Sequence, residues 1–199
     1  MQGGSRAIDY DLVSLSSLDS DENLALRQRV NESLGEFSCT KSPTLERLAR
    51  KDLWRREGHG SGRTYLFLTY QRDTIDVAGF FTVGMGAVDL SGVSNSARKK
   101  LLGDFSAHYV AGFLIAGLAR SDSYAGDQLP GSVILDEAKR VIANARIHVG
   151  GRYVIVDAQP AVFEKLYQPV GFLDVKVANP PLDQSDQIFR TYMMKIKDW

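Results

Sequence analysis

The amino-acid sequence predicts an α/β protein with one mixed sheet of six or seven strands and about four flanking helices. Two apolar runs, at 109–119 and 152–158, have the continuous hydrophobic character of buried central strands. A long segment with helical periodicity lies between them, so the three segments form a strand, helix, strand crossover. Such a connection is right-handed and places its two strands parallel in one sheet. Segments rich in β-branched and aromatic residues on both sides supply antiparallel strands.

A short strand and two helices are expected at the beginning of the chain. Residues 10–15, YDLVSL, have strand character, and the apolar residues that follow at helical spacing predict a first helix closed by Gly35. Ser42 and Pro43 have the pattern of an N-cap and a first-turn proline, so a second helix is expected to begin there. The polar segment 56–63, REGHGSGR, is expected to be a hinge that follows this helix.

An antiparallel pair of strands is expected next. Residues 64–70, TYLFLTY, and 77–88, VAGFFTVGMGAV, have the β-branched and aromatic content of strands, and the chain is expected to turn at 71–76. A basic, polar stretch that contains SARKKLLG at 96–103 then leads to the central apolar run.

The second half of the chain is expected to contain two helices and the last strands. Apolar residues from Ile134 to Ala145 lie on one face of a long helix, and charged residues cover the other face. A short helix is expected to begin at Pro160. Strands at 172–177 and 188–196 complete the sheet.

Length and composition indicate the class of protein. The 199 residues, of which 44% are hydrophobic, predict a single domain that spans 1–199. The 24 basic and 24 acidic side chains cancel, so the net charge does not favour nucleic acid or an anionic membrane. A single cysteine excludes an intramolecular disulfide, and the first residues lack the features of a signal peptide. No apolar run reaches the ~20 residues of a membrane-spanning helix, so we expect a soluble, cytoplasmic protein without membrane contact.

The order of these elements, with four motifs, resembles the GNAT superfamily of acyl-CoA-dependent N-acetyltransferases. The motifs are LIAGLAR in the central strand, the loop at 123–132 with its helix, RYVIVDA, and VFEKLYQPVGF, which resembles the family's segment ending in Tyr, three residues, Gly-Phe. The resemblance covers about 10–197 and implies the family's fold, acetyl-CoA as cosubstrate and a primary amine as acceptor. The stretch FSCTKSPTLERLARKDLW resembles a bacterial branch that includes the toxin acetyltransferases of toxin–antitoxin pairs. That branch implies aminoacyl-tRNA as an acceptor and an antitoxin as a partner, and it leaves a homodimer open.

The loop SYAGDQLPGS at 123–132 is the candidate cofactor cradle, because a loop that opens a helix after a strand presents unpaired backbone N–H groups to an anion. The family's pyrophosphate motif is Gln or Arg, two residues, Gly, one residue, then Gly or Ala. One register sets Gln128 and Gly131 in this motif and Val133 at its last position. That register places Asp136 at a position where the helix requires an apolar residue.

A second register sets Gly131 as the last glycine of the motif, with Gly126 at its first position and Leu129 in place of its first glycine. We prefer this register, because it places Ile134 and Leu135 at the apolar positions of the helix.

A third register, one residue shorter, places Pro130 at the final glycine. Binding in each register uses backbone N–H groups, so the lost side chains do not abolish it, although Pro130 supplies no N–H and Asp127 repels phosphate. The alternative is a loop that has lost its affinity for the cofactor. The resemblance assigns acetyl-CoA binding to the end of the central strand and to this loop: Leu118, Ala119, Arg120, Gly126, Asp127, Gln128, Leu129, Pro130, Gly131 and Ser132.

Tyr167 is the candidate catalytic residue, because a phenol of pKa ~10 can protonate a departing thiolate whose conjugate acid has a pKa near 8.5. The alternative is that Tyr167 is an ordinary core tyrosine.

By resemblance, backbone groups of Leu118 and Arg120 at the end of the central strand are exposed to the acetyl carbonyl and pantetheine. Gly117 either permits the bulge that this requires or relieves crowding in the core. Asp157 is expected to cap the next helix or to orient an amine.

No metal site is expected, because the three histidines lie far apart in the sequence. The glycines at 58–62 precede a strand, whereas a dinucleotide-binding loop follows a strand and opens a helix, and Cys39 is expected to pack as a small hydrophobic residue.

Two basic clusters could hold RNA phosphates or form solvated helix faces: Arg47, Arg50, Lys51, Arg55 and Arg56 in the first, and Arg98, Lys99 and Lys100 in the second. Three functions therefore stay open: an acetyltransferase acting on aminoacyl-tRNA, one acting on a small amine, and a catalytically silent binding protein of the same fold.

Overall fold

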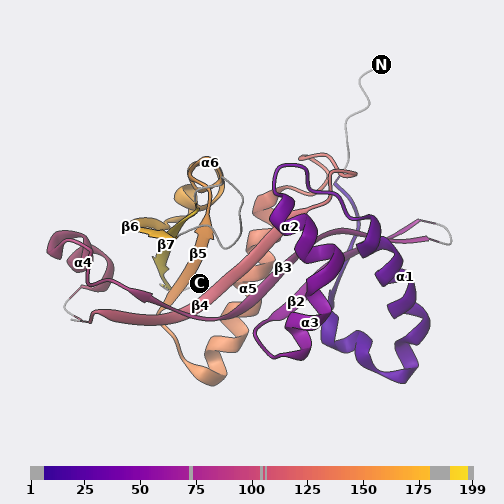
Figure 1. Cartoon of the computed structure of the whole chain (residues 1–199), viewed down its shortest axis with the longest axis horizontal. Helices are drawn as coiled ribbons and strands as arrows, with labels where there is room; N and C mark the ends of the chain where they lie inside the picture. Colours follow the sequence, from indigo (N-terminus) through magenta and orange to yellow (C-terminus); the bar gives the residue numbers. More distant parts are fainter. Residues whose placement is uncertain (1–6, 72–73, 104, 106, 180–188, 197–199) are drawn as a thin grey trace, which may run out of the picture. The chain divides into compact units, whose positions relative to one another are not determined.

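Seven strands form one mixed sheet in the order β1-β2-β3-β4-β5-β7-β6, which confirms the predicted fold class (Figure 1). The computed structural model describes residues 7–71, 74–103, 105, 107–179 and 189–196. The strands are β1 Asp11–Ser14, β2 Arg63–Gln71, β3 Thr74–Asp89, β4 Tyr109–Arg120, β5 Tyr153–Ala158, β6 Leu173–Asn179 and β7 Phe189–Lys195. The α-helices of the described residues are α1 Leu24–Glu36, α2 Pro43–Arg47, α3 Leu53–Gly58, α4 Asn95–Leu102, α5 Gly131–Val149 and α6 Pro160–Val162.

The chain divides into two compact units. The first unit comprises Met1–Val83 and Gly117–Arg140, and the second comprises Gly84–Ala116 and Val141–Trp199. Because β3, β4 and α5 each contribute to both units, the division does not follow the ends of elements.

In the first unit, β1, β2 and β3 pair antiparallel, and β2 and β3 form the predicted hairpin with Gln71 opposite Thr74. Buried residues of α1 and of the helical segment after Ser42 share one apolar core with buried residues of these strands, including Leu66 and Phe80. Removal of this apolar surface from water is the dominant stabilising contribution. Cys39 belongs to the same core, as predicted, and burial raises the pKa of its thiol.

The end of α1 differs from the prediction. Gly35 does not close the helix as a left-handed residue; it lies in the last turn, and the cap is Phe37. The Phe37 ring is buried and packs edge-on against Phe80, with ring centroids 5.5 Å apart. The chain therefore leaves the helix at a residue whose ring packs in the core.

The second predicted helix begins as expected at Ser42, whose Oγ accepts a hydrogen bond from the Leu45 N–H at 3.4 Å. A π-helical turn at Leu48–Asp52, which the sequence did not predict, interrupts it before α3. The hinge at 56–63 holds the end of α3 and a turn that leads into β2.

In the second unit, β4 and β5 pair in parallel through Phe113–Ile115 and Val154–Val156, as the crossover predicted. Strand β7 pairs antiparallel with both β5 and β6, so the last strand of the chain lies between them. The basic stretch at 96–103 contains the helix α4, which the sequence analysis did not predict (Figure 1). Ser94 caps this helix, and its Leu101 and Leu102 are buried in the apolar core of the unit.

None of the helices that the structure describes is long and apolar enough to cross a membrane.

Candidate active site

The loop between β4 and α5 belongs to the first unit and has the helix phase of the preferred register. Strand β4 ends at Arg120, and α5 begins at Gly131. Ile134 and Leu135 are fully buried, whereas Asp136 is exposed to solvent. The register that starts at Gln128 places Asp136 at an apolar position, so the observed burial is inconsistent with it.

Hydrogen bonds within the loop hold it in a tight turn. The Gln128 side chain accepts a hydrogen bond from the Ala125 N–H at 2.7 Å. The N–H groups of Gln128 and Leu129 both donate to the Ala125 carbonyl oxygen, at 3.1 and 3.2 Å. The loop therefore uses the Gln128 side chain internally.

Four backbone N–H groups of the loop and the first helical turn have no acceptor within the described part of the chain. They belong to Gly126, Asp127, Gly131 and Ser132. Unpaired N–H groups at the start of a 19-residue helix favour an anion, and the helix dipole adds to the effect. Binding of the diphosphate of a nucleotide cosubstrate such as acetyl-CoA by these groups stays a prediction; Pro130 donates nothing to it, and Asp127 contributes a negative charge.

The remaining residues predicted to contact acetyl-CoA lie at the end of β4. Its pairing with β5 stops at Ile115, and the strand continues for five residues, including Leu118, Ala119 and Arg120. A side chain at Gly117 would begin 3.3 Å from Leu48 and 3.4 Å from Leu45. This close contact fits the interpretation that Gly117 relieves crowding in the core. Exposure of β4 backbone groups to an acetyl carbonyl stays a prediction.

Tyr167 belongs to the second unit and ends a π-helical segment, Phe163–Tyr167. Its side chain is 3% exposed, and its ring packs edge-on against Phe172 at 5.3 Å. Burial raises the pKa of the phenol well above its ordinary value, so Tyr167 stays protonated at neutral pH and is a weaker acid than a free phenol. Gly171 adopts φ 100°, which lets the chain turn from this segment into β6.

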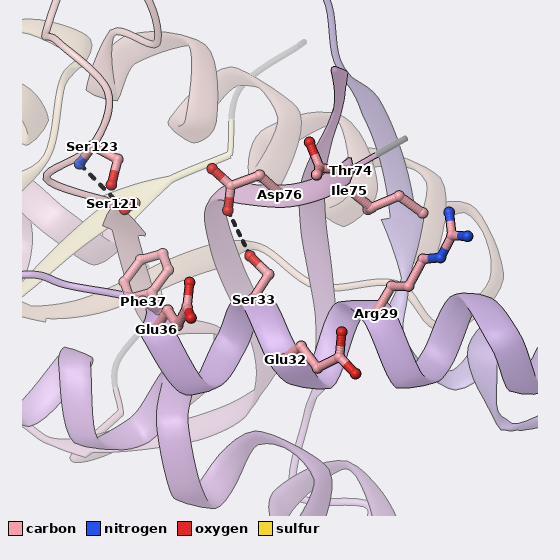
Figure 2. Close-up of a pocket in the computed structure, with 10 residues that line it drawn as sticks. All are labelled: Arg29, Glu32, Ser33, Glu36, Phe37, Thr74, Ile75, Asp76, Ser121 and Ser123. Carbon is pink, nitrogen blue, oxygen red and sulfur yellow. Dashed lines mark hydrogen bonds between the residues drawn. The ribbon is translucent and has the colours of Figure 1, made fainter. Parts of the chain in front are cut away.

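A pocket of about 510 Å³ lies beside α1 in the first unit, and Figure 2 shows the side chains that line it. At its centre the Asp76 carboxylate accepts hydrogen bonds from Ser33 Oγ at 2.6 Å and from the Tyr124 hydroxyl at 2.7 Å. The Tyr124 hydroxyl also lies 2.8 Å from Thr69 Oγ1. Burial, together with the bond to Asp76, raises the pKa of Tyr124 to about 12, even though the bond to Thr69 lowers it.

This network ties the start of the loop at Tyr124 to β2, β3 and α1. The sequence analysis missed it, because Asp76 falls in a segment assigned to a turn. Its partners Ser33 and Thr69 are polar residues of common types in a helix and a strand, and no spacing motif joins them.

The two basic clusters lie in different units. In the first, Arg50 Nε donates to the Phe37 carbonyl oxygen at 2.7 Å and its guanidinium pairs with Glu46, while Arg55 pairs with Asp52. Lys51 and Arg56 are exposed. In the second cluster Arg98 lies 3.0 Å from His108 Nδ1 and pairs with the side chain of Asn95.

The contacts of Asp157 and His59, the other candidate residues, are with the protein's own strands and helices. The Asp157 carboxylate accepts a hydrogen bond from Thr191 Oγ1 at 2.7 Å across the sheet and does not cap α6, whose N-cap is Gln159. His59 caps the end of α3. No group of three or more metal-ligating side chains occurs among the residues that the structure describes.

The fold is the one that the GNAT resemblance implied, because the chain superposes on solved structures of acetyltransferase toxins. No family model and no curated protein matches the sequence. Solved structures do match. The toxin AtaT in complex with acetyl-methionyl-tRNAfMet is 18% identical, with 94% of this chain and 95% of that chain covered and a TM-score of 0.65.

Two further structures have the same fold. A tyrosine-to-phenylalanine mutant of KacT is 17% identical, with 92% and 94% coverage and a TM-score of 0.64. A mutant of AtaT bound to acetyl-CoA and the C-terminus of the antitoxin AtaR is 18% identical, with 94% and 93% coverage and a TM-score of 0.62. At these identities the likeness establishes the fold.

Proposed function

We propose that this chain is an acetyl-CoA-dependent N-acetyltransferase that acts on a primary amine. The observation that carries the proposal is the loop between β4 and α5, with its four N–H groups that lack acceptors in the described chain. The structures of AtaT in complexes that contain acetyl-CoA and acetyl-methionyl-tRNA support it, because those proteins have this fold.

The proposed reaction gives each predicted residue a role. The N–H groups of Gly126, Asp127, Gly131 and Ser132 bind the diphosphate. Backbone groups of β4 near Leu118 orient the pantetheine arm and the acetyl carbonyl. The amine nitrogen attacks the thioester carbon, the carbon–sulfur bond breaks, and the departing thiolate takes the proton of the Tyr167 hydroxyl. The attacking nitrogen loses its extra proton to water, and the Tyr167 phenolate regains a proton from water.

The proposed acceptor is the α-amine of aminoacyl-tRNA. An aminoacyl ester has an α-amine whose pKa does not exceed the ~7.7–8.0 of a peptide terminus, so much of it is neutral at pH 7. A lysine amine of pKa ~10.4 requires a strong base for the same attack. The exposed Lys51 and Arg56 supply positive charge for RNA phosphates. The proposal includes a cytoplasmic location, where both substrates occur, and an antitoxin partner.

One observation favours a second function, a catalytically silent binding protein of this fold. The Tyr167 side chain is buried, and a proton donor must reach its acceptor. In the silent protein Tyr167 only packs in the core. The loop then binds no cosubstrate, because Pro130 supplies no N–H and Asp127 repels phosphate.

Transfer of a radiolabelled acetyl group from acetyl-CoA separates these functions. We expect label on bulk aminoacyl-tRNA and much less on polyamines, aminoglycosides or lysine-bearing peptides. Label on a small amine with none on tRNA identifies a small-molecule acetyltransferase. The absence of label on every acceptor, together with absence of acetyl-CoA binding, identifies the silent protein.

A further inference from the structure

The guanidinium of Arg120 lies against the candidate cofactor loop. Its Nη1 donates a hydrogen bond to the Leu129 carbonyl oxygen at 3.2 Å. A side chain at Gly126 would begin 3.5 Å from Nη1 and 3.9 Å from Nη2. Position 126 is where the preferred register places the Gln or Arg of the family motif. The Arg120 guanidinium therefore occupies the space beside the residue whose side chain is missing.

Most of the hydrogen-bonding capacity of this guanidinium is unused. Arginine carries five N–H donors, and the structure gives one of them an acceptor. Its Nε is buried and has no hydrogen-bond partner among the residues that the structure describes. Its guanidinium makes no direct ion pair with the described residues; the charge of Asp122, which accepts a hydrogen bond from the Thr40 N–H at 2.7 Å, acts on it at longer range.

An unpaired buried donor destabilises a folded protein. An anion at the loop would supply the missing partner. A guanidinium presents paired N–H groups whose geometry matches two phosphate oxygens, and it stays charged at every accessible pH. The position of Arg120 beside Gly126 and Leu129 places this charge at the loop that carries the free backbone N–H groups.

We propose that the Arg120 side chain supplies the positive charge that binds the diphosphate of acetyl-CoA, in place of the side chain absent at Gly126 and against the negative charge of Asp127. The inference rests on the proposed function, and it adds a role for a side chain where the family resemblance implied only backbone contacts. Arg120 is thus a binding residue specific for the anionic half of the cosubstrate.

Calorimetric titration of the full chain with acetyl-CoA tests this inference, with Arg120→Met and Arg120→Lys as the variants. Methionine keeps the packing of the aliphatic stem and removes the charge. We expect Arg120→Met to bind acetyl-CoA about tenfold more weakly or worse, and Arg120→Lys to keep most of the affinity. Arg27→Met removes an exposed arginine of the same unit that pairs with Asp19, and should leave the affinity unchanged.

Two readouts separate binding of the diphosphate from a merely structural role. The affinity of Arg120→Met should depend less steeply on salt than that of the wild-type chain, because one charge contact is lost. S-acetylpantetheine, which lacks the diphosphate, should bind wild-type and Arg120→Met equally. If Arg120→Met does not fold, Arg120→Gln replaces it with the same expected results.

Equal acetyl-CoA affinity in wild-type and Arg120→Met would overturn this inference alone. An unchanged salt dependence, or equal losses for acetyl-CoA and acetylpantetheine, would show that Arg120 only supports the loop. Failure of the wild-type chain to bind acetyl-CoA would overturn the proposed function as well.

Discussion

Two tyrosines have proposed roles that single substitutions can test. Tyr167 is the candidate proton donor in the second unit, and Tyr124 anchors the candidate cofactor loop to Asp76 in the first. The sequence motif identified Tyr167, whereas the role of Tyr124 emerges only from its contacts. Both phenols are neutral at pH 7, but only the Tyr167 proton is assigned to the reaction.

Tyr167→Phe should keep the fold and the affinity for acetyl-CoA while turnover falls by ~10²-fold or more, the usual scale for loss of a general acid. Tyr153→Phe is a matched control, because Tyr153 is a buried tyrosine of the same unit whose hydroxyl has no hydrogen-bond partner in the described part of the chain. Steady-state rates of acetyl transfer check the expectation. Unchanged turnover in Tyr167→Phe would remove this residue from the mechanism.

Tyr124→Phe should change how stability depends on pH. The pKa of Tyr124 is raised to about 12 from an ordinary value of 10.0, so above pH 10 the unfolded chain releases this proton before the folded chain does. The contribution of Tyr124 to stability is therefore complete below pH 10 and is lost as the pH rises toward 12. Urea unfolding between pH 9 and 12 should show a shallower decline for Tyr124→Phe than for wild type. Parallel declines would contradict this account.

At the scale of elements, the sequence predicted what depends on local pattern. The crossover formed by β4, α5 and β5, the β2–β3 hairpin and the cap at Ser42 all follow from periodicity and turn chemistry. Two features were missed. The cap of helix α4 at Ser94 is a local signal that the sequence analysis did not use, whereas Phe37 at the end of α1 packs against Phe80, which is distant in the sequence. The same holds for the candidate site: the loop follows from a local sequence pattern and was predicted, whereas the Asp76 network joins residues distant in the sequence and was not.

The first turn of α5 should be sensitive to added negative charge. Gly131→Glu introduces a carboxylate where the diphosphate is proposed to bind, so acetyl-CoA binding should be lost while the melting temperature changes little. Gly35→Glu is the control, because Gly35 lies on α1 and a Cβ added there would meet none of the described atoms of other segments within 4 Å. Retained affinity in Gly131→Glu would exclude the start of α5 as the cradle.

The two glycines after α5 should differ in their tolerance of alanine. Gly150 and Gly151 both have positive φ, 72° and 121°, so each substitution carries backbone strain of about 1–2 kcal/mol. At Gly151 the added Cβ would also lie 2.6 Å from the Phe113 ring, whereas none of the described atoms lies within 4 Å at Gly150. We expect Gly151→Ala to lose an additional ~1–3 kcal/mol of unfolding free energy. Equal losses in chemical denaturation would contradict the packing argument.

At the scale of the whole molecule, the balanced net charge means that RNA binding must come from local clusters. The structure refines the choice of residues to test. Arg50 and Arg55 are engaged within the protein, whereas Lys51 and Arg56 are exposed on the same helical segment. An exposed lysine or arginine that contacts a phosphate contributes to the salt dependence of binding.

Replacing Lys51 and Arg56 by alanine should weaken binding of charged tRNA and reduce the slope of log affinity against log salt by about one to two. Replacing Lys99 and Lys100 tests the second cluster in the same way. Acetyl-CoA affinity, measured in parallel, should stay unchanged and serves as the control. If neither pair alters the slope, the basic clusters are solvated faces that do not contact RNA.

The central claim is that this chain binds acetyl-CoA at the loop between β4 and α5, and calorimetric titration of the wild-type chain with acetyl-CoA tests it most directly. The account predicts saturable heat from one site. It also predicts a rise of several degrees in melting temperature, because ligand at 100 times its Kd stabilises the folded state by ~2.7 kcal/mol. No heat and no thermal shift at millimolar acetyl-CoA would contradict the claim and leave the catalytically silent protein as the function.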